Sequence, residues 1–311
     1  MGSFHKEMYK DLECGLLGIS RIMERYRCEW DRRVKFAELQ WAIDEVRRYV
    51  GPGYEGRARE RIERLDLLSR TARSNYQEGV GLMFKWCVRA GRQFQMALNL
   101  ASEDPSKADL DIIRGVIVSA VEVGLDRALA SLELLNDSHL EVSQAKDLLH
   151  SILHDVVDDF GPSGLYGRRR GSLQALMEEE QSEKNRIGIS SLVVAFVPFG
   201  AAISLLGILA IKACEERIQS YKNRIDNMES LYWSSKRALE EARQVVKDGI
   251  ELQLDEDIRH LTVLKAKIDE AHLARTFLKS KNPDIRALFV PVLGKLREQC
   301  QSFVEWHGSM E

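Results

Sequence analysis

The sequence lacks the features that mark a disulfide-rich secreted protein, a zinc-organised fold or a nucleic-acid binder. Its 311 residues include only six prolines, five cysteines and 7% aromatic residues. The cysteines are odd in number and widely spaced, and they form no CxxC pair, which argues against a disulfide framework or a zinc cluster. We expect them to be buried as small apolar side chains. A net charge of -3 argues against dedicated nucleic-acid binding, which normally requires a basic excess.

Motifs of the common enzyme classes are also missing. The glycine-rich stretch Gly161–Gly171 has no GxxxxGK[ST] pattern to cradle phosphate, and neither GxSxG nor HExxH occurs. His150 and His154 lie one helical turn apart with Asp147 and Asp158 on the same side, a spacing that could hold a metal. Solvated or capping side chains are the simpler interpretation. The sequence therefore predicts no catalytic residue, metal site or cofactor.

Long amphipathic helices dominate the first half of the chain. Apolar residues recur at gaps of three and four from Met8 to Trp41, from Ile62 to Ala97 and from Leu110 to Phe160. The segment 51–53, Gly-Pro-Gly, ends the first stripe, and residues 103–106 end the second. Three helical segments are predicted here.

Two interruptions are expected near the middle of the chain. Ser138 with Glu141 three residues later has the form of a capping box, so the third stripe should break and restart there. Gly161–Gly167 reads as a loop that runs into Arg168-Arg169-Arg170, and a polar helix is expected from Ser172 to Arg186.

The longest helical pattern runs from Ala213 to about Lys279. A seven-residue apolar repeat holds from Ile218 to Val246 and resumes out of phase at Leu254, which predicts a register shift near Gly249. A last helix closes the chain, and Pro291 should kink or restart it.

These patterns predict an all-α fold, an elongated bundle of very long helices with an apolar helical hairpin in mid-chain. No alternating strand pattern occurs. Helices of roughly 45–65 residues would be about 70–100 Å long. The predicted organisation has three parts: 1–171 as the first part of a long-helix bundle, 172–212 as a polar helix and hydrophobic hairpin, and 213–311 as a coiled-coil-like helix and C-terminal helix that complete the bundle.

The uncharged segment Ile187–Ile211 determines the functional interpretation. It exceeds the ~20 residues needed to cross a hydrocarbon core, but Pro198-Phe199-Gly200 lies at its centre. Three interpretations compete: a constitutive transmembrane helix with a kink, a hairpin that inserts conditionally, and a hairpin buried permanently in a soluble core.

Conditional insertion reconciles this segment with a chain that is 30% charged and otherwise well patterned for solubility. The turn would lie at Pro198 and Gly200. The residues expected to contact the membrane are Leu192, Val193, Val194, Phe196, Val197, Phe199, Ile203, Leu205, Leu206, Ile208 and Leu209. Arg168, Arg169 and Arg170 form the one concentrated basic cluster; they could meet anionic lipid headgroups, be cut by a protease, or simply be solvated.

This pattern resembles the cytolysin A and alpha-xenorhabdolysin superfamily of α-pore-forming toxins. The resemblance rests on Leu192–Leu209, on the long stripes before it and on the long helix after it. It implies a non-enzymatic toxin, or toxin subunit, that is released in soluble form, inserts into a membrane and assembles into a homo-oligomeric pore. A second toxin subunit is an implied partner, and lipid is the other. Nucleic acid is not expected.

Two alternatives remain open at this point. A coiled-coil scaffold anchored permanently by Ile187–Ile211 would not purify without detergent, whereas a toxin would. A metal-dependent oxidase bundle would contain iron or manganese. The N-terminus opens no secretory signal region, so a toxin is expected to be secreted without a recognisable signal peptide and to reach the target-cell membrane on insertion.

Overall fold

The structure is a computed structural model that describes residues 26–102, 107–194, 200–279 and 288–308. Within these ranges, side chains are described except at 100–102, 107–110, 190–194, 200–206 and 278–279. The described residues are helical apart from short turns, and they contain no strand. The all-α prediction is therefore confirmed.

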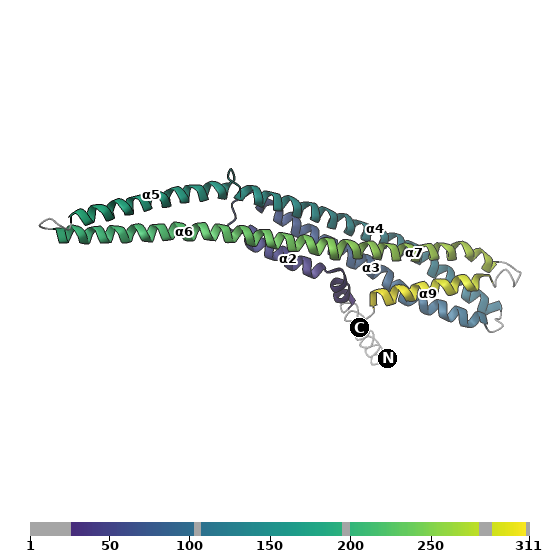
Figure 1. The fold of residues 1–311 in the computed structure, drawn as a ribbon. Coiled ribbons are helices and arrows are strands. Elements are labelled where there is room, and N and C mark those ends of the chain that lie inside the picture. The colour runs from purple at the N-terminus through teal and green to yellow at the C-terminus, as the bar shows by residue number, and fades with distance from the viewer. Residues whose placement is uncertain (1–25, 103–106, 195–199, 280–287, 309–311) are drawn as a thin grey trace, which may run out of the picture. The chain divides into compact units, whose positions relative to one another are not determined.

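The helices are long and few loops separate them (Figure 1). Their bounds are α2 Phe36–Val50, α3 Arg59–Ser102, α4 Lys107–Phe160, α5 Leu165–Val194, α6 Gly200–Val245, the π-helix η1 Val246–Glu251, α7 Leu252–Ala274, the 3-10 helix η2 Arg275–Lys279 and α9 Phe289–Gly308. Residues 26–34 are also helical. The 54 residues of α4 correspond to about 80 Å. Pro291 lies in the first turn of α9, where its missing N–H costs no helical bond.

The chain forms two compact units, each discontinuous in sequence. The first consists of the described residues of Met1–Gln40, Leu67–Lys146 and Gln244–Glu311. The second consists of Trp41–Asp66 and the described residues of Asp147–Arg243. The predicted boundaries near residues 171 and 212 stay a prediction.

In the first unit, α3 and α4 pack through polar as well as apolar contacts. The Trp86 indole N–H donates to the Ala120 carbonyl at 3.0 Å, and the Ser131 hydroxyl donates to the Gly79 carbonyl. Buried side chains of α3 that line this unit include Tyr76, Val80, Met83, Cys87, Ala90 and Phe94. The predicted burial of the cysteines is confirmed for Cys87, Cys214 and Cys300 and is wrong for Cys28, which is exposed; Cys14 lies outside the described residues.

The predicted break in α4 at Ser138 does not occur. Ser138 is fully buried, and its hydroxyl donates to the Ala72 carbonyl of α3 at 2.8 Å. Glu141 accepts a bond from the Asn75 amide of α3 at 3.2 Å instead of reaching back to its own backbone. The capping-box residues therefore join two helices, and α4 continues through them because the helical backbone needs no cap there.

A break does occur at Lys35, where the sequence predicted one continuous stripe through Trp41. Lys35 has a φ of 60°, so helix 26–34 ends there and α2 begins at Phe36. A left-handed lysine carries a steric cost that glycine avoids. Gly249 of η1 lies against Lys35, and a Cβ added to Gly249 would lie 2.8 Å from the lysine Cδ.

The predicted register shift near Gly249 is confirmed. The spacing between the apolar positions Val246 and Leu254 is eight residues and not seven, and η1 lies in this interval. A π-turn accommodates one extra residue within a helix, so the buried stripe stays on one face. Val246, Leu254, Leu261 and Ile268 are all fully buried.

A prediction about α3–α4 packing follows from Gly124. A Cβ at this position would lie 2.4 Å from Cζ2 of Trp86, whereas a Cβ at Gly115, on the same helix, would meet nothing within 4 Å. Gly124→Ala should therefore lower the free energy of unfolding by about 1–3 kcal/mol, the usual cost of overpacking. Gly115→Ala should raise it by about 0.5–1 kcal/mol, since alanine favours helix. Urea unfolding measures both, and equal effects of the two variants would contradict this packing.

Candidate functional site

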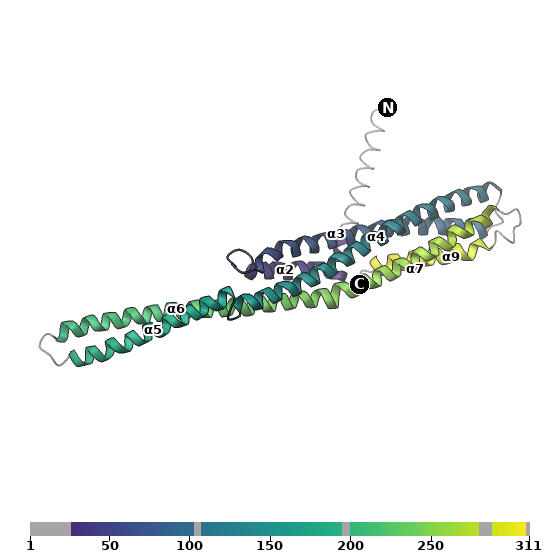
Figure 2. The ribbon, with the colours of Figure 1, turned by 90° about the horizontal axis from the view of Figure 1, so that it is seen from above.

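The second unit contains an antiparallel pair of helices, α5 and α6, that lie side by side (Figures 1 and 2). Three ion pairs join them: Lys184 with Glu215 at 2.7 Å, Arg217 with Glu180 at 2.7 Å, and Arg170 with Glu229 at 3.8 Å. In each pair the two residues lie about equally far along the sequence from residue 199, as the antiparallel pairing of two consecutive helices requires. We call the part from Leu173 to Arg186 and from Lys212 to Ile225 the shaft.

Charge more than apolar packing holds the shaft together. Among its described side chains, only Leu173, Cys214 and Ile225 are buried apolar residues. The hydrogen bond from Arg217 lowers the pKa of the Glu180 carboxyl below its usual value. Surface ion pairs contribute little each, so two helices joined in this way form an element that can separate or repack at small cost.

The structure places the predicted membrane-contacting residues at the ends of these helices, next to the junction between them. Leu192, Val193 and Val194 end α5; Gly200 begins α6, followed by Ile203, Leu205 and Leu206. Phe196, Val197, Pro198 and Phe199 lie outside the described residues. The turn at Pro198 and Gly200 therefore stays a prediction, as does membrane contact by the whole set.

Three apolar side chains near the two ends of the segment Ile187–Ile211, one on α5 and two on α6, are exposed. Ile208 is 60% exposed and Leu209 is 56% exposed, and both belong to the predicted set. Ile189, at 67%, was not in that set, although it lies in the same uncharged segment. A permanently buried core would cover these side chains, so their exposure argues against that interpretation at both ends of the segment. Among the described residues, no helix is both long enough and apolar enough to cross a membrane.

The basic cluster belongs to α5 and not to a loop, since α5 begins at Leu165. Arg168 donates to the Ser163 carbonyl, Arg169 pairs with Glu55, and Arg170 pairs with Glu229. The turn at Gly161–Gly164 brings the backbone at Gly164 close to Asp158, where a Cβ would lie 2.1 Å from the Asp158 carbonyl oxygen. Glycine permits this close approach, and α5 begins directly after the turn. The cluster thus contacts other residues of the second unit at the start of α5, and its contact with lipid stays a prediction.

The histidine pattern considered as a metal site does not gather ligands. His154 pairs with Asp158 at 3.3 Å on the helix surface, and His150 is exposed. Across the described side chains there is no group of three or more histidine, cysteine, aspartate or glutamate residues placed to hold a metal ion.

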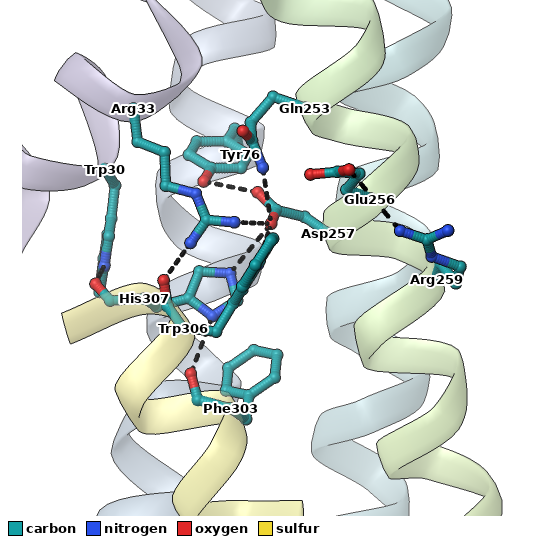
Figure 3. A network of polar contacts seen from close by, with 10 residues as sticks. All are labelled: Trp30, Arg33, Tyr76, Gln253, Glu256, Asp257, Arg259, Phe303, Trp306 and His307. Carbon is teal, nitrogen blue, oxygen red and sulfur yellow. Dashed lines mark hydrogen bonds and ion pairs between the residues drawn. The ribbon is translucent and has the colours of Figure 1, made fainter. Parts of the chain in front are cut away.

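A buried polar cluster in the first unit was not anticipated from the sequence (Figure 3). At its centre is Asp257 of α7, which has no exposed surface. The carboxylate accepts hydrogen bonds from Arg33 at 2.9 Å, Tyr76 at 2.8 Å and the Trp306 indole at 2.7 Å. His307 Nε2 lies 3.5 Å from the same carboxylate. One buried charge therefore joins helix 26–34, α3, α7 and α9.

Further contacts hold helix 26–34 to α9. The Trp30 indole donates to the His307 carbonyl at 2.8 Å, and Arg33 donates to the Trp306 carbonyl. The Arg33 guanidinium also lies 3.9 Å from the centre of the Trp306 ring, within cation–π distance. Asp31 of the same helix pairs with Arg73 of α3. We call the contacts of Asp257, Arg33, Trp306 and His307 the Asp257 cluster.

The fold defines a class: an all-α protein of very long helices, in which α5 and α6 form an antiparallel pair. The family model for haemolysin E (HlyE) matches residues 8–308, and the chain belongs to this family. It is a toxin family, so the prediction that the chain is a toxin and not an enzyme is confirmed.

Solved structures of low sequence identity are similar to this chain. The pre-pore AhlB of the tripartite alpha-pore forming toxin AHL from Aeromonas hydrophila has 12% identity and a TM-score of 0.51, over 88% of this chain and 92% of that chain. The soluble AhlC of the same toxin has 11% identity and a TM-score of 0.49, over 91% and 99%. The SmhB pore of the tripartite toxin Smh from Serratia marcescens has 11% identity and a TM-score of 0.48, over 86% of this chain and 98% of that chain. No curated protein matches the sequence.

Proposed function

We propose that this chain is an α-pore-forming toxin, or one subunit of such a toxin. It is soluble until it meets a target membrane, inserts the apolar end of the α5–α6 hairpin and oligomerises into a pore. The observation that carries the proposal is membership of the haemolysin E family over residues 8–308. The apolar segment Ile187–Ile211 at the end of a charged shaft supports the insertion step.

The proposed insertion divides the hairpin into two regions. Residues from Leu192 to Leu209 enter the acyl region, where each Å² of apolar surface removed from water contributes about 25 cal/mol. The shaft stays in polar surroundings because its ion pairs and charged faces would be costly in hydrocarbon. Arg168, which forms no ion pair with a described residue, is the member of the basic cluster best placed to meet a lipid phosphate.

A partner subunit is a further part of the proposal. AhlB, AhlC and SmhB are described as parts of tripartite toxins, and this chain shares the fold of AhlB. We propose that secretion precedes action at a target-cell membrane, and that assembly uses copies of this chain with or without a second protein.

Dye release from liposomes by the purified full chain tests the proposal. The chain should purify from the aqueous phase without detergent and should release an encapsulated dye, either alone or with partner subunits supplied. A chain that needs detergent throughout purification would instead support a constitutive anchor. A soluble chain that leaves every vesicle intact, in every combination of subunits, would contradict the proposed function.

A further inference from the structure

A groove runs between α3 and α4 in the first unit and encloses about 640 Å³. One wall comes from Leu82 to Gln93 of α3, and the other from Gly115 to Arg127 of α4. Each wall is about a dozen residues long, so the groove extends for roughly 16 Å along the helices. A groove between two antiparallel helices has the shape that a third helix fills.

Small residues and the ring of a tryptophan line the floor of the groove, so few side-chain atoms fill it. Ala90 and Ala120 are buried on the two helices, and Trp86 lies across α4 at Gly124. The indole is held there by its hydrogen bond to the Ala120 carbonyl. Val123, at 46% exposed, lines the apolar part of the opening.

The rim of the groove carries three cations. Lys85 and Arg89 lie one turn apart on α3, and Arg127 lies on α4; all three are exposed. None of them forms an ion pair with another residue that the structure describes. Other exposed arginines of the first unit do have an acidic neighbour, such as Arg32 with Glu29 at 3.2 Å and Arg259 with Glu256 at 3.7 Å. The groove therefore presents positive charge around an apolar floor.

A second surface of α4 has the opposite character. We call Leu129, Glu133, Asp137 and Leu140 the acidic stripe. The two leucines are 55% and 56% exposed, and they lie eleven positions apart, or about 16 Å along the helix. Glu133 and Asp137 lie between them on the same face, are exposed, and make no ion pair within the described ranges. Exposed leucines beside unpaired acids are typical of a helix face that a partner covers.

We propose that the acidic stripe of one copy of this chain docks into the α3–α4 groove of a second copy. The inference rests on the proposed assembly of copies, and names the surface that makes it. The leucines match the apolar floor, the length of the stripe matches the length of the groove, and Glu133 and Asp137 meet Lys85 and Arg89 on the rim. Electrostatic complementarity of this kind fixes partner and register.

Such a contact is heterologous and therefore propagates. At about 100° per residue, the groove positions of α4 and the stripe positions are centred roughly 100° apart around the helix. Each copy can then offer its stripe to one neighbour and its groove to another. A head-to-tail contact of this type closes into a ring or extends as a chain, whereas a two-fold contact stops at a dimer.

Charge reversal tests the contact through three variants. Lys85→Glu with Arg89→Glu reverses the groove, Glu133→Lys with Asp137→Lys reverses the stripe, and the fourfold variant reverses both. Oligomers are measured by chemical cross-linking on lipid vesicles. Each double variant should lose at least tenfold in cross-linked oligomer, while its circular dichroism and thermal midpoint match those of the parent.

Restoration makes the test specific. The fourfold variant, and an equimolar mixture of the two double variants, should both regain the parent's oligomers, because opposite charges then face each other at every contact. A matched control, Lys222→Glu with Arg224→Glu on exposed positions of α6, changes the charge equally and should assemble as the parent does. Double variants that assemble normally, or a failure of both restorations, would overturn the inference.

A direct measurement identifies the contact itself. A carbodiimide joins a lysine amine to a carboxylate only when the two touch, so assembled protein should yield a Lys85–Glu133 or Lys85–Asp137 amide. Mixing ¹⁵N-labelled and unlabelled chains shows by mass spectrometry that the linked peptides come from different copies. Oligomers that yield neither amide would count against the groove.

The two levels of the proposal fail in different ways. Vesicle leakage by the parent that persists unchanged in the charge-reversed variants would overturn the groove contact and leave the proposed function intact. A parent that neither leaks dye nor forms oligomers on vesicles, with or without partner subunits, would overturn the proposed function and the contact with it.

Discussion

Replacing Val194 and Leu205 together by aspartate is expected to abolish dye release from liposomes. An aspartate at the centre of a membrane-inserted helix costs about 3 kcal/mol, so two of them disfavour insertion by about 6 kcal/mol, or roughly four powers of ten. Because neither position need lie at the bilayer centre, a loss of at least a hundredfold in leakage rate is the expected result. The measured quantity is the rate of dye release per mole of protein.

The soluble fold should not change, because Val194 ends α5 and Leu205 lies within the first turns of α6, so that both positions fall outside the shaft and its buried residues. Circular dichroism of the variant should match the parent. Gln181→Asp with Gln219→Asp provides a matched control, since both glutamines are exposed on the shaft and, among the described residues, bond only to neighbours one turn away on their own helix. This control adds the same charge outside the apolar segment and should leak as the parent does.

Equal leakage by the Val194/Leu205 variant and the parent would show that the hairpin does not enter the bilayer. Equal loss by the apolar-segment variant and the shaft control would assign the effect to added charge rather than to the hydrocarbon contact. Either result would contradict the insertion step.

Helix identity and extent could be predicted from the sequence wherever apolar spacing was the only signal needed. The stripe from Ile62 to Ala97 became α3, and the one-residue shift near Gly249 became η1. A local period is decided within one helix, so the chain itself encodes it. The signals that failed were those with two possible partners.

Ser138 and Glu141 show this ambiguity. A serine and a glutamate three residues apart satisfy a helix end in isolation, but the same side chains can bond to a neighbouring helix. The structure has them on Ala72 and Asn75 of α3, whose position depends on tertiary packing. The left-handed Lys35 is likewise set by the contact with η1, more than two hundred residues later, and no local residue announces it.

The sequence does contain a signal for the Asp257 cluster, but a search for apolar periodicity alone does not detect it. Asp257 lies three residues after Leu254 and four before Leu261, on the same buried face of α7. A charged residue at a core position of an otherwise apolar repeat predicts a buried polar contact. What the sequence could not provide was the partners, since Arg33, Tyr76 and Trp306 come from three separate segments.

Asp257→Asn is expected to destabilise the first unit by about 3–5 kcal/mol. The carboxylate is fully buried and receives donors from Arg33, Tyr76 and Trp306, so its removal leaves the guanidinium of Arg33 without its charge partner. An asparagine amide cannot accept all of these bonds, and its own N–H groups would face other donors. Asp255→Asn is the matched control: its side chain is 66% exposed and pairs with His139 at the surface, so it should cost less than about 1 kcal/mol.

The pH dependence of this difference has a definite sign. Burial disfavours the ionised Asp257 carboxyl, but the hydrogen bond and charge of His307, together with the Arg33 charge, outweigh burial and lower its pKa below the ordinary value. A carboxyl with a lowered folded-state pKa stabilises the fold above the unfolded-state pKa of about 3.9 and loses that contribution as the pH falls through the folded-state pKa. Parent and Asp257→Asn should therefore differ fully at about pH 6, and converge as the pH falls below about 4.

Urea unfolding at several pH values measures this convergence, and limited proteolysis locates it. Because Asp257 holds helix 26–34 through Arg33, the variant should be cut within residues 26–34 sooner than the Asp255→Asn control. Cleavage at the same rate in both variants, or a stability difference that widens as the pH falls, would mean that the buried carboxylate does not hold this helix in place. The contacts of Trp30 with α9 and of Asp31 with α3 would then be sufficient for that role.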